Sequence, residues 1–456
     1  MTRRRAAPVL VALALCLPAP PTAQAHGLGG STSPGIPGWL FAWGAALALV
    51  VSFAALGAFW RRPQLEHARE RRVAGIPRAL DPLCGAVGVA TFAGLVYAGL
   101  FGAQDSLDNI LPTWVFVVFW VGTPVASAVL GDVFRAFNPW LAAARGVAWV
   151  ARRPGARLPY PTWLGQWPAA LTVLAFGWLE LVFGGRDDPS TLAVLALAYA
   201  FAQMVGMALF GIDTWRRRGD GFAVYFGLFA RLAPIAWHDG AVWTRRPLAG
   251  AAELEPMPGT VAIVCTGLGV TMFDGLSAGP AWRWVVGPLQ SGGALEVVST
   301  LGLVGCALLM GGAYRFGISG MRTRRDDEAV TVLSARFVHS LLPIVLAYVI
   351  AHYATLLLFQ GQAVASLASD PLGDGANWLG TSSLSIDYAL VGSTGIWAIQ
   401  VGAVVCGHVA GLALAHDRAL VATRDARSAA RTQRTMLAIM VSLTSLALWL
   451  ISSANQ

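Results

Sequence analysis

Three ionisable residues lie deep within long apolar stretches of this sequence: Glu180, Asp274 and His352. An ionisable side chain inside a bilayer is costly, so each of them is a candidate functional residue. Counted at about 1.5 Å per helical residue, they lie roughly 21–24 Å from the inner ends of their segments, in the outer third of a membrane. Tyr97 and Gln400 are predicted at the same depth, so five segments contribute to one polar layer.

Carboxylates and an imidazole in one layer permit three kinds of role. Glu180, Asp274 and His352 carry the ligand atoms of a divalent metal site, such as a zinc site, and metal-bound water is a nucleophile near neutral pH. The same side chains could instead pass protons or cations along a path. They could also form a hydrogen-bonded girdle that holds helices together.

The composition indicates that a membrane surrounds these residues. Of the 456 residues, 56% are hydrophobic and 12% are charged, whereas an average soluble domain is about 25% charged. Together with a mean hydropathy of +0.60, these values exclude a water-soluble globular protein, a disordered chain and a nucleic-acid-binding domain. The absence of Lys excludes Schiff-base and P-loop lysine chemistry, and the five Cys are too far apart to suggest a metal or disulfide framework.

The N-terminus has the pattern of a secretory signal peptide. Three arginines precede an apolar core at 8–18, and the Ala-Gln-Ala that ends at Ala25 is a typical cleavage pattern. We therefore predict a cleaved segment 1–25 and a single integral membrane domain at 26–456. Cleavage leaves His26 as the mature N-terminus, where an α-amino group and an imidazole could chelate copper, although a coincidence of the cleavage site is the simpler interpretation.

The mature chain is predicted to be an all-α bundle of about ten transmembrane helices, because a span needs roughly 20 mostly apolar residues. With the mature N-terminus outside, ten spans place the C-terminus outside as well. The predicted spans are 39–60, 83–102, 112–131, 166–185, 191–213, 259–278, 295–316, 337–360, 391–415 and 434–452.

The arginine distribution fits this topology. The predicted inner loops carry nearly all of the loop arginines, whereas the outer loops carry acidic residues and only Arg186 and Arg283. An excess of arginine on one side is typical of the inner side of a membrane. The sequence His416-Asp417-Arg418 is interpreted as the charged inner end of its span.

Three loops carry further patterns. The inner loops contain GDVFRAFNPW (131–140) and GDGFAVYFGLFARLAPIAW (219–237), either a weak internal echo of two helices in the inner interface or a chance similarity. In the outer loop 360–390, Asp370 and Asp374 could ligate a cation, but an Asx-type turn is the preferred interpretation. This loop could also form a lid over the polar layer.

Several of these stretches carry a family resemblance. They are GDVFRAFNPW, RDDPSTLA, YFGLFARLAP, TMFDGLSAGP, AHYATLLLFQGQ, SDPLGDG, GHVAGLALAHDRAL and LWLISSANQ, spread over most of the mature chain. The chain resembles bacterial multi-pass membrane proteins labelled fenitrothion hydrolase-like. The resemblance implies a hydrolase of the bacterial cytoplasmic membrane that acts on organophosphorus triesters and releases a nitrophenol. It supplies no catalytic residues.

If the chain is such a hydrolase, the residues permit one mechanism. A divalent metal held by Glu180, Asp274 and His352 would polarise the phosphoryl oxygen and activate water. Tyr97 could donate to the leaving phenolate or to the phosphoryl oxygen. Gln400 and Gln360 are the candidates for binding a small lipophilic substrate that enters from the bilayer.

Two other classes of function stay open: a transporter or permease for a metal ion or small solute, and a non-catalytic membrane scaffold. An enzyme predicts that Glu180, Asp274 and His352 face one closed pocket with an outer mouth. A transporter predicts a path that continues past the layer toward the inner side. A scaffold predicts that the polar residues pair with the backbone and leave no cavity.

Overall fold

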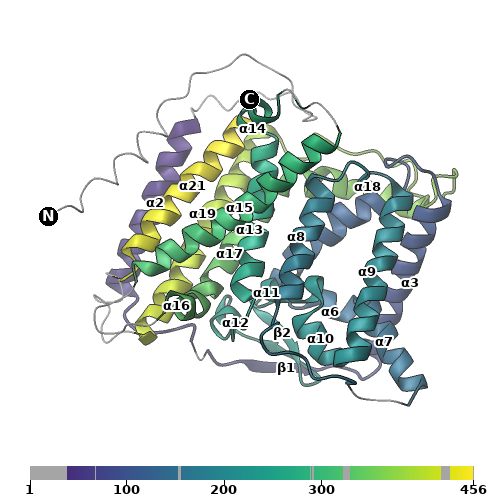
Figure 1. The fold of residues 1–456 in the computed structure, drawn as a ribbon, viewed down its shortest axis with the longest axis horizontal. Helices are drawn as coiled ribbons and strands as arrows, with labels where there is room; N and C mark the ends of the chain where they lie inside the picture. The colour runs from purple at the N-terminus through teal and green to yellow at the C-terminus, as the bar shows by residue number, and fades with distance from the viewer. Residues whose placement is uncertain are drawn as a thin grey trace.

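The computed structural model describes residues 38–66, 68–152, 156–287, 289, 292–321, 329–422 and 432–454. The predicted signal peptide and His26 lie outside these residues. Long helices run side by side through the molecule, and short helices and a small sheet lie at their ends (Figure 1). This architecture confirms the prediction of an all-α helical bundle.

Each of the ten predicted spans coincides with a helix. Among the described residues, seven helical stretches are long and apolar enough to cross a membrane, and the other three predicted spans contain shorter apolar helices. These helices are apolar around most of their circumference, which is typical of helices that face lipid or a membrane protein core. Their bounds are α2 (Gly38–Phe59), α3 (Leu80–Phe101), α4–η1–α5 (Ile110–Leu130), α8 (Trp167–Leu181), α9 (Pro189–Phe210), α13 (Thr260–Ser277), α15 (Gly293–Ser319), α16–η2–α17–η3–α18 (Val330–Ser369), α19 (Ser393–Ala422) and α21 (Arg434–Ala454).

The arginine-bearing loops that the structure describes gather at one end of the bundle, which we call the Arg-rich end (Figure 1, bottom). A three-stranded antiparallel sheet of order β1-β3-β2 lies there, which the sequence analysis did not predict. Its hairpin turns at Asp239 and Gly240, whose φ values of +51° and +67° fit a two-residue turn. The elements at this end are α6 (Val133–Phe137), α7 (Pro139–Val150), α10 (Ile212–Arg218), α11 (Gly221–Ala230), α12 (Ala249–Ala252), β1 (Arg71–Gly75), β2 (Ile235–His238) and β3 (Ala241–Thr244). The short α14 (Pro280–Val286) lies at the opposite end (Figure 1).

The two Gly-Asp motifs are helix N-caps that meet each other. Asp132 accepts from the backbone N of Arg135 at the start of α6, and Asp220 caps α11 in the same way. Asp220 also accepts from Trp140 Nε1 over 2.6 Å and from Asn138 Nδ2 over 3.0 Å, so the second motif holds the first. The expectation that both helices lie in the interface is wrong for α11, which is buried along nearly its whole length.

Asp417 anchors the segment after α2 to α19. Its carboxylate is fully buried and accepts four hydrogen bonds of 2.6–3.0 Å, from the indole of Trp60 and the backbone N–H groups of Gln64, Leu65 and Glu66. From the sequence alone, this residue is interpreted as part of a charged span end. It is instead a buried acceptor, because four donors compensate the loss of water.

Helix α17 (Leu342–Thr355) packs closely on α19, so alanine substitutions at two glycines of α19 should differ in their effect on stability. We expect Gly407→Ala to destabilise the protein by about 1–3 kcal/mol, because overpacking forces helices apart. A Cβ there would lie 2.2 Å from Cβ of Ala347 and 2.6 Å from the carbonyl oxygen of Pro343. Gly402→Ala on the same helix meets nothing within 4 Å and serves as the control. Equal thermal unfolding midpoints for the two variants in detergent would contradict this packing.

Candidate functional site

The site is built around two residues on neighbouring helices, Asp274 on α13 and His352 on α17. His352 Nε2 lies 2.8 Å from Asp274 Oδ2. The His352 side chain is 24% exposed and the Asp274 side chain 19%, so both stay accessible within the bundle. A carboxylate beside one ring nitrogen orients the imidazole and leaves the other nitrogen to exchange a proton with a ligand.

A second pair adjoins the first. Tyr353, the residue after His352, donates its hydroxyl to Glu180 Oε1 over 3.1 Å. Because Tyr353 directly follows His352 in the chain, this bond places Glu180 beside the Asp274–His352 pair. The structure thus brings together three of the five residues of the predicted polar layer, from α8, α13 and α17.

Glu180 keeps one oxygen free. Its Oε2 is buried and has no hydrogen-bond partner among the described residues, and a buried polar atom without a partner is uncommon. Two π-helical segments lie against each other nearby. One is η1 (Trp114–Gly122), and the other is η3 (Leu356–Gln360), which follows Tyr353 in the chain. Such wide turns are frequent at functional sites because they shift side chains out of regular register.

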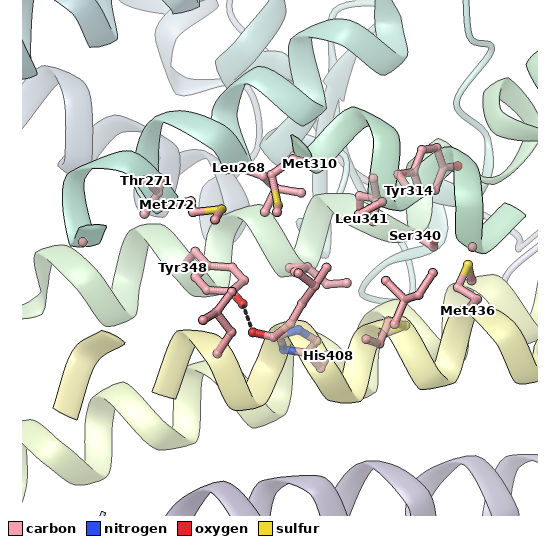
Figure 2. Close-up of a pocket in the computed structure, with 18 of the residues that line it drawn as sticks. Leu268, Thr271, Met272, Met310, Tyr314, Ser340, Leu341, Tyr348, His408 and Met436 are labelled. Atoms are coloured by element: carbon pink, nitrogen blue, oxygen red, sulfur yellow. Dashed lines mark hydrogen bonds between the residues drawn. The ribbon is translucent and has the colours of Figure 1, made fainter. Parts of the chain in front are cut away.

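His352 also borders a cavity of about 110 Å³ among α13, α15, α17, α19 and α21. Gly275 also lines it, and an added Cβ there would make ordinary van der Waals contact, 3.9 Å, with Nδ1 and Cε1 of the imidazole. The labelled lining residues form a row from Met272 and Tyr348 at one end to Ser340 and Met436 at the other (Figure 2). Glu180 and Asp274 do not line this cavity, so His352 is the only one of the three that borders it.

The predicted metal ligands do not form a three-ligand group. Among the described residues, no cluster of three or more His, Cys, Asp and Glu side chains is placed to hold a metal ion. His352 Nε2 is turned toward Asp274, and Glu180 Oε1 accepts from Tyr353. These ligand atoms face partners within the protein, so the geometry does not support the predicted zinc-type site.

Three other predicted site residues make no hydrogen bond or ion pair with Asp274 or His352 in the described part of the chain. Tyr97 is 56% exposed and packs on Phe101 of its own helix, with 4.9 Å between ring centroids. Its helix α3 packs mainly on α9 and α7, so a catalytic role for Tyr97 is not supported. Gln400 is buried on α19 and Gln360 ends η3, but neither lines the cavity.

The outer loop forms turns that its acidic side chains cap. Asp370 accepts from the backbone N of Asp374 over 3.1 Å and of Gly375 over 2.9 Å. Leu372 of the same turn accepts from the backbone N of Ala103, which ties it to the end of α3. These contacts agree with the Asx-type turn rather than with a cation loop.

Two residues of this site were not predicted from the sequence: Tyr353 and Arg186. Arg186 Nη1 donates to the backbone oxygen of Glu180 over 3.0 Å. One signal was present, since Arg186 is one of two arginines in the predicted outer loops. For Tyr353 no signal existed, because apolar spans are rich in aromatic side chains.

The functional roles of these residues rest on their chemistry and geometry. Compared with protein-family models, curated proteins and solved structures, the chain matches none of them.

Proposed function

We propose that this chain is a membrane-embedded hydrolase in which His352, oriented by Asp274, acts as general base on a lipophilic ester. The observation that carries the proposal is the 2.8 Å contact of Nε2 with Oδ2, in a pair whose imidazole also borders a cavity. General-base catalysis needs a base held in one orientation within reach of the proton it removes.

The proposed reaction uses one water molecule. With Nε2 held by Asp274, Nδ1 removes a proton from water, and the water oxygen attacks phosphorus. The bond from phosphorus to the aryl oxygen then breaks, and the imidazolium returns its proton to the leaving phenolate. Asp274 stabilises the imidazolium in between. The products are a phosphodiester acid and a phenol.

The proposal also covers the class of substrate and the topology of the chain in the membrane. Organophosphorus triesters are the class that the sequence resemblance implies, and such compounds partition into a bilayer. We place the chain in the bacterial cytoplasmic membrane with ten spans, a cleaved signal peptide and both termini outside. Gathering of the arginine-bearing loops at one end supports this orientation.

The test is an assay of the full chain in lipid vesicles. Release of nitrophenolate from a dialkyl nitrophenyl phosphotriester and from nitrophenyl acetate is followed by absorbance, with protein-free vesicles as background. We expect turnover by the wild type and by Tyr97→Phe, whose ring lies away from the site. If folded wild-type protein hydrolysed neither of the two esters, the hydrolase proposal would be rejected.

A proton-coupled transporter is the second candidate, and one observation favours it. The cavity continues from His352 along α17 and α21 toward the Arg-rich end, and a path past the polar layer is what transport requires. Vesicles loaded with a pH-sensitive dye separate the candidates: proton flux that His352→Gln removes, without ester hydrolysis, supports transport. A scaffold is disfavoured because the polar residues pair with each other beside a cavity.

A further inference from the structure

The length and volume of the cavity restrict its occupant. On α21 the lining runs from Met436 to Leu446, a separation that corresponds to about 15 Å of helix. Its volume is only about 110 Å³, well below the roughly 300–1,000 Å³ of sites for compact drug-sized ligands. A long and narrow space suits an unbranched chain better than a ring system.

Most polar groups on the cavity wall are already used within the protein. Four hydroxyl groups donate to backbone carbonyl oxygens over 2.7–3.3 Å, those of Thr271, Tyr314, Ser340 and Tyr348. His408 directs Nδ1 to the carbonyl oxygen of Val404 over 2.7 Å. Along most of its length an occupant therefore meets hydrocarbon surface, which favours an apolar ligand.

The remaining wall is adaptable and reaches the surface. Met272, Met310, Met436 and Met440 line it, and methionine side chains adjust to ligands of varied shape. Leu446 lies on the wall and is 37% exposed, although its neighbours along the cavity are buried or half-buried. Leu446 lies on one of the shorter apolar helices, so in a membrane the molecules that can reach its exposed side chain are bilayer lipids.

We infer that the cavity binds the hydrocarbon chain of a single-chain lipid ester drawn from the bilayer, with the ester group at His352 and the chain end near Gly317 and Met436. The placement of the ester rests on the proposed function, whereas the placement of the chain rests on the cavity alone. The native substrate is then a long-chain ester, and a short aryl triester fills only the His352 end.

Photo-crosslinking tests the placement of the hydrocarbon chain independently of hydrolysis. The full-length protein in vesicles is labelled with a long-chain alkyl ester that carries a diazirine at the end of its hydrocarbon chain. Labelled residues are identified by mass spectrometry. We expect labels on Gly317, Ser340 or Met436. Labels confined to lipid-facing residues such as Phe316, which is 66% exposed and adjacent to Gly317, would overturn the inference.

A cavity-filling variant tests the same point by kinetics. Ala313 lines the cavity, and Ala313→Leu should lower kcat/KM for nitrophenyl myristate by about tenfold, because it displaces about two methylenes of the chain. The value for nitrophenyl acetate should stay unchanged. The control is Ala198→Leu on exposed α9 surface. Equal loss for both esters, or no loss, would contradict chain binding, and crosslinks without hydrolysis would reject only the proposed function.

Discussion

Replacing His352 with Gln is expected to lower kcat for nitrophenyl ester hydrolysis by about 10²–10⁴-fold, the usual contribution of a positioned general base. Gln keeps a polar group near Asp274 but has no basic nitrogen, so KM should change little. Stopped-flow or steady-state nitrophenolate release in vesicles measures both constants. Wild-type kcat in a correctly folded H352Q variant would show that the base lies elsewhere.

Asp274→Asn should produce a loss of similar size for a different reason. Asn keeps the shape of the side chain but removes the charge that orients the imidazole and stabilises the imidazolium. Because the two residues act as one unit, the H352Q/D274N double variant should be no slower than the slower single variant. Multiplied losses in the double variant would instead indicate that the two residues act independently.

Replacing Asp417 with Ala is expected to lower stability by at least about 3 kcal/mol, since each buried donor left without an acceptor costs about 1–3 kcal/mol. The indole of Trp60 and three consecutive backbone N–H groups would lose their acceptor. We expect a lower thermal unfolding midpoint in detergent and faster proteolysis at 60–66.

A matched control separates burial from charge in this experiment. Asp81 pairs with Arg145 over 3.0 Å, but its side chain is 50% exposed, and exposed pairs contribute about 0–1 kcal/mol. Asp81→Ala should therefore leave the midpoint almost unchanged. Similar midpoints for D417A and D81A would contradict the anchoring role of Asp417.

Depth along each helix could be predicted from the sequence, but rotation about the helix axis could not. Glu180, Asp274 and Tyr97 stand at comparable depths in their apolar segments. The first two meet near His352, whereas Tyr97 faces outward. In a soluble helix an apolar stripe reveals the buried face, but spans that are apolar all round give no such direction.

The sequence by itself determined the apolar segments, their helical state and the separation of basic from acidic loops. A bilayer demands long apolar helices with satisfied backbone groups, and this demand is local in sequence. Only the tertiary structure decided that His352 pairs with Asp274, that Tyr353 joins Glu180 and that Asp417 is buried under Trp60. These contacts join residues about 80 to 360 positions apart, and they depend on which helix faces pack together, which local pattern does not encode.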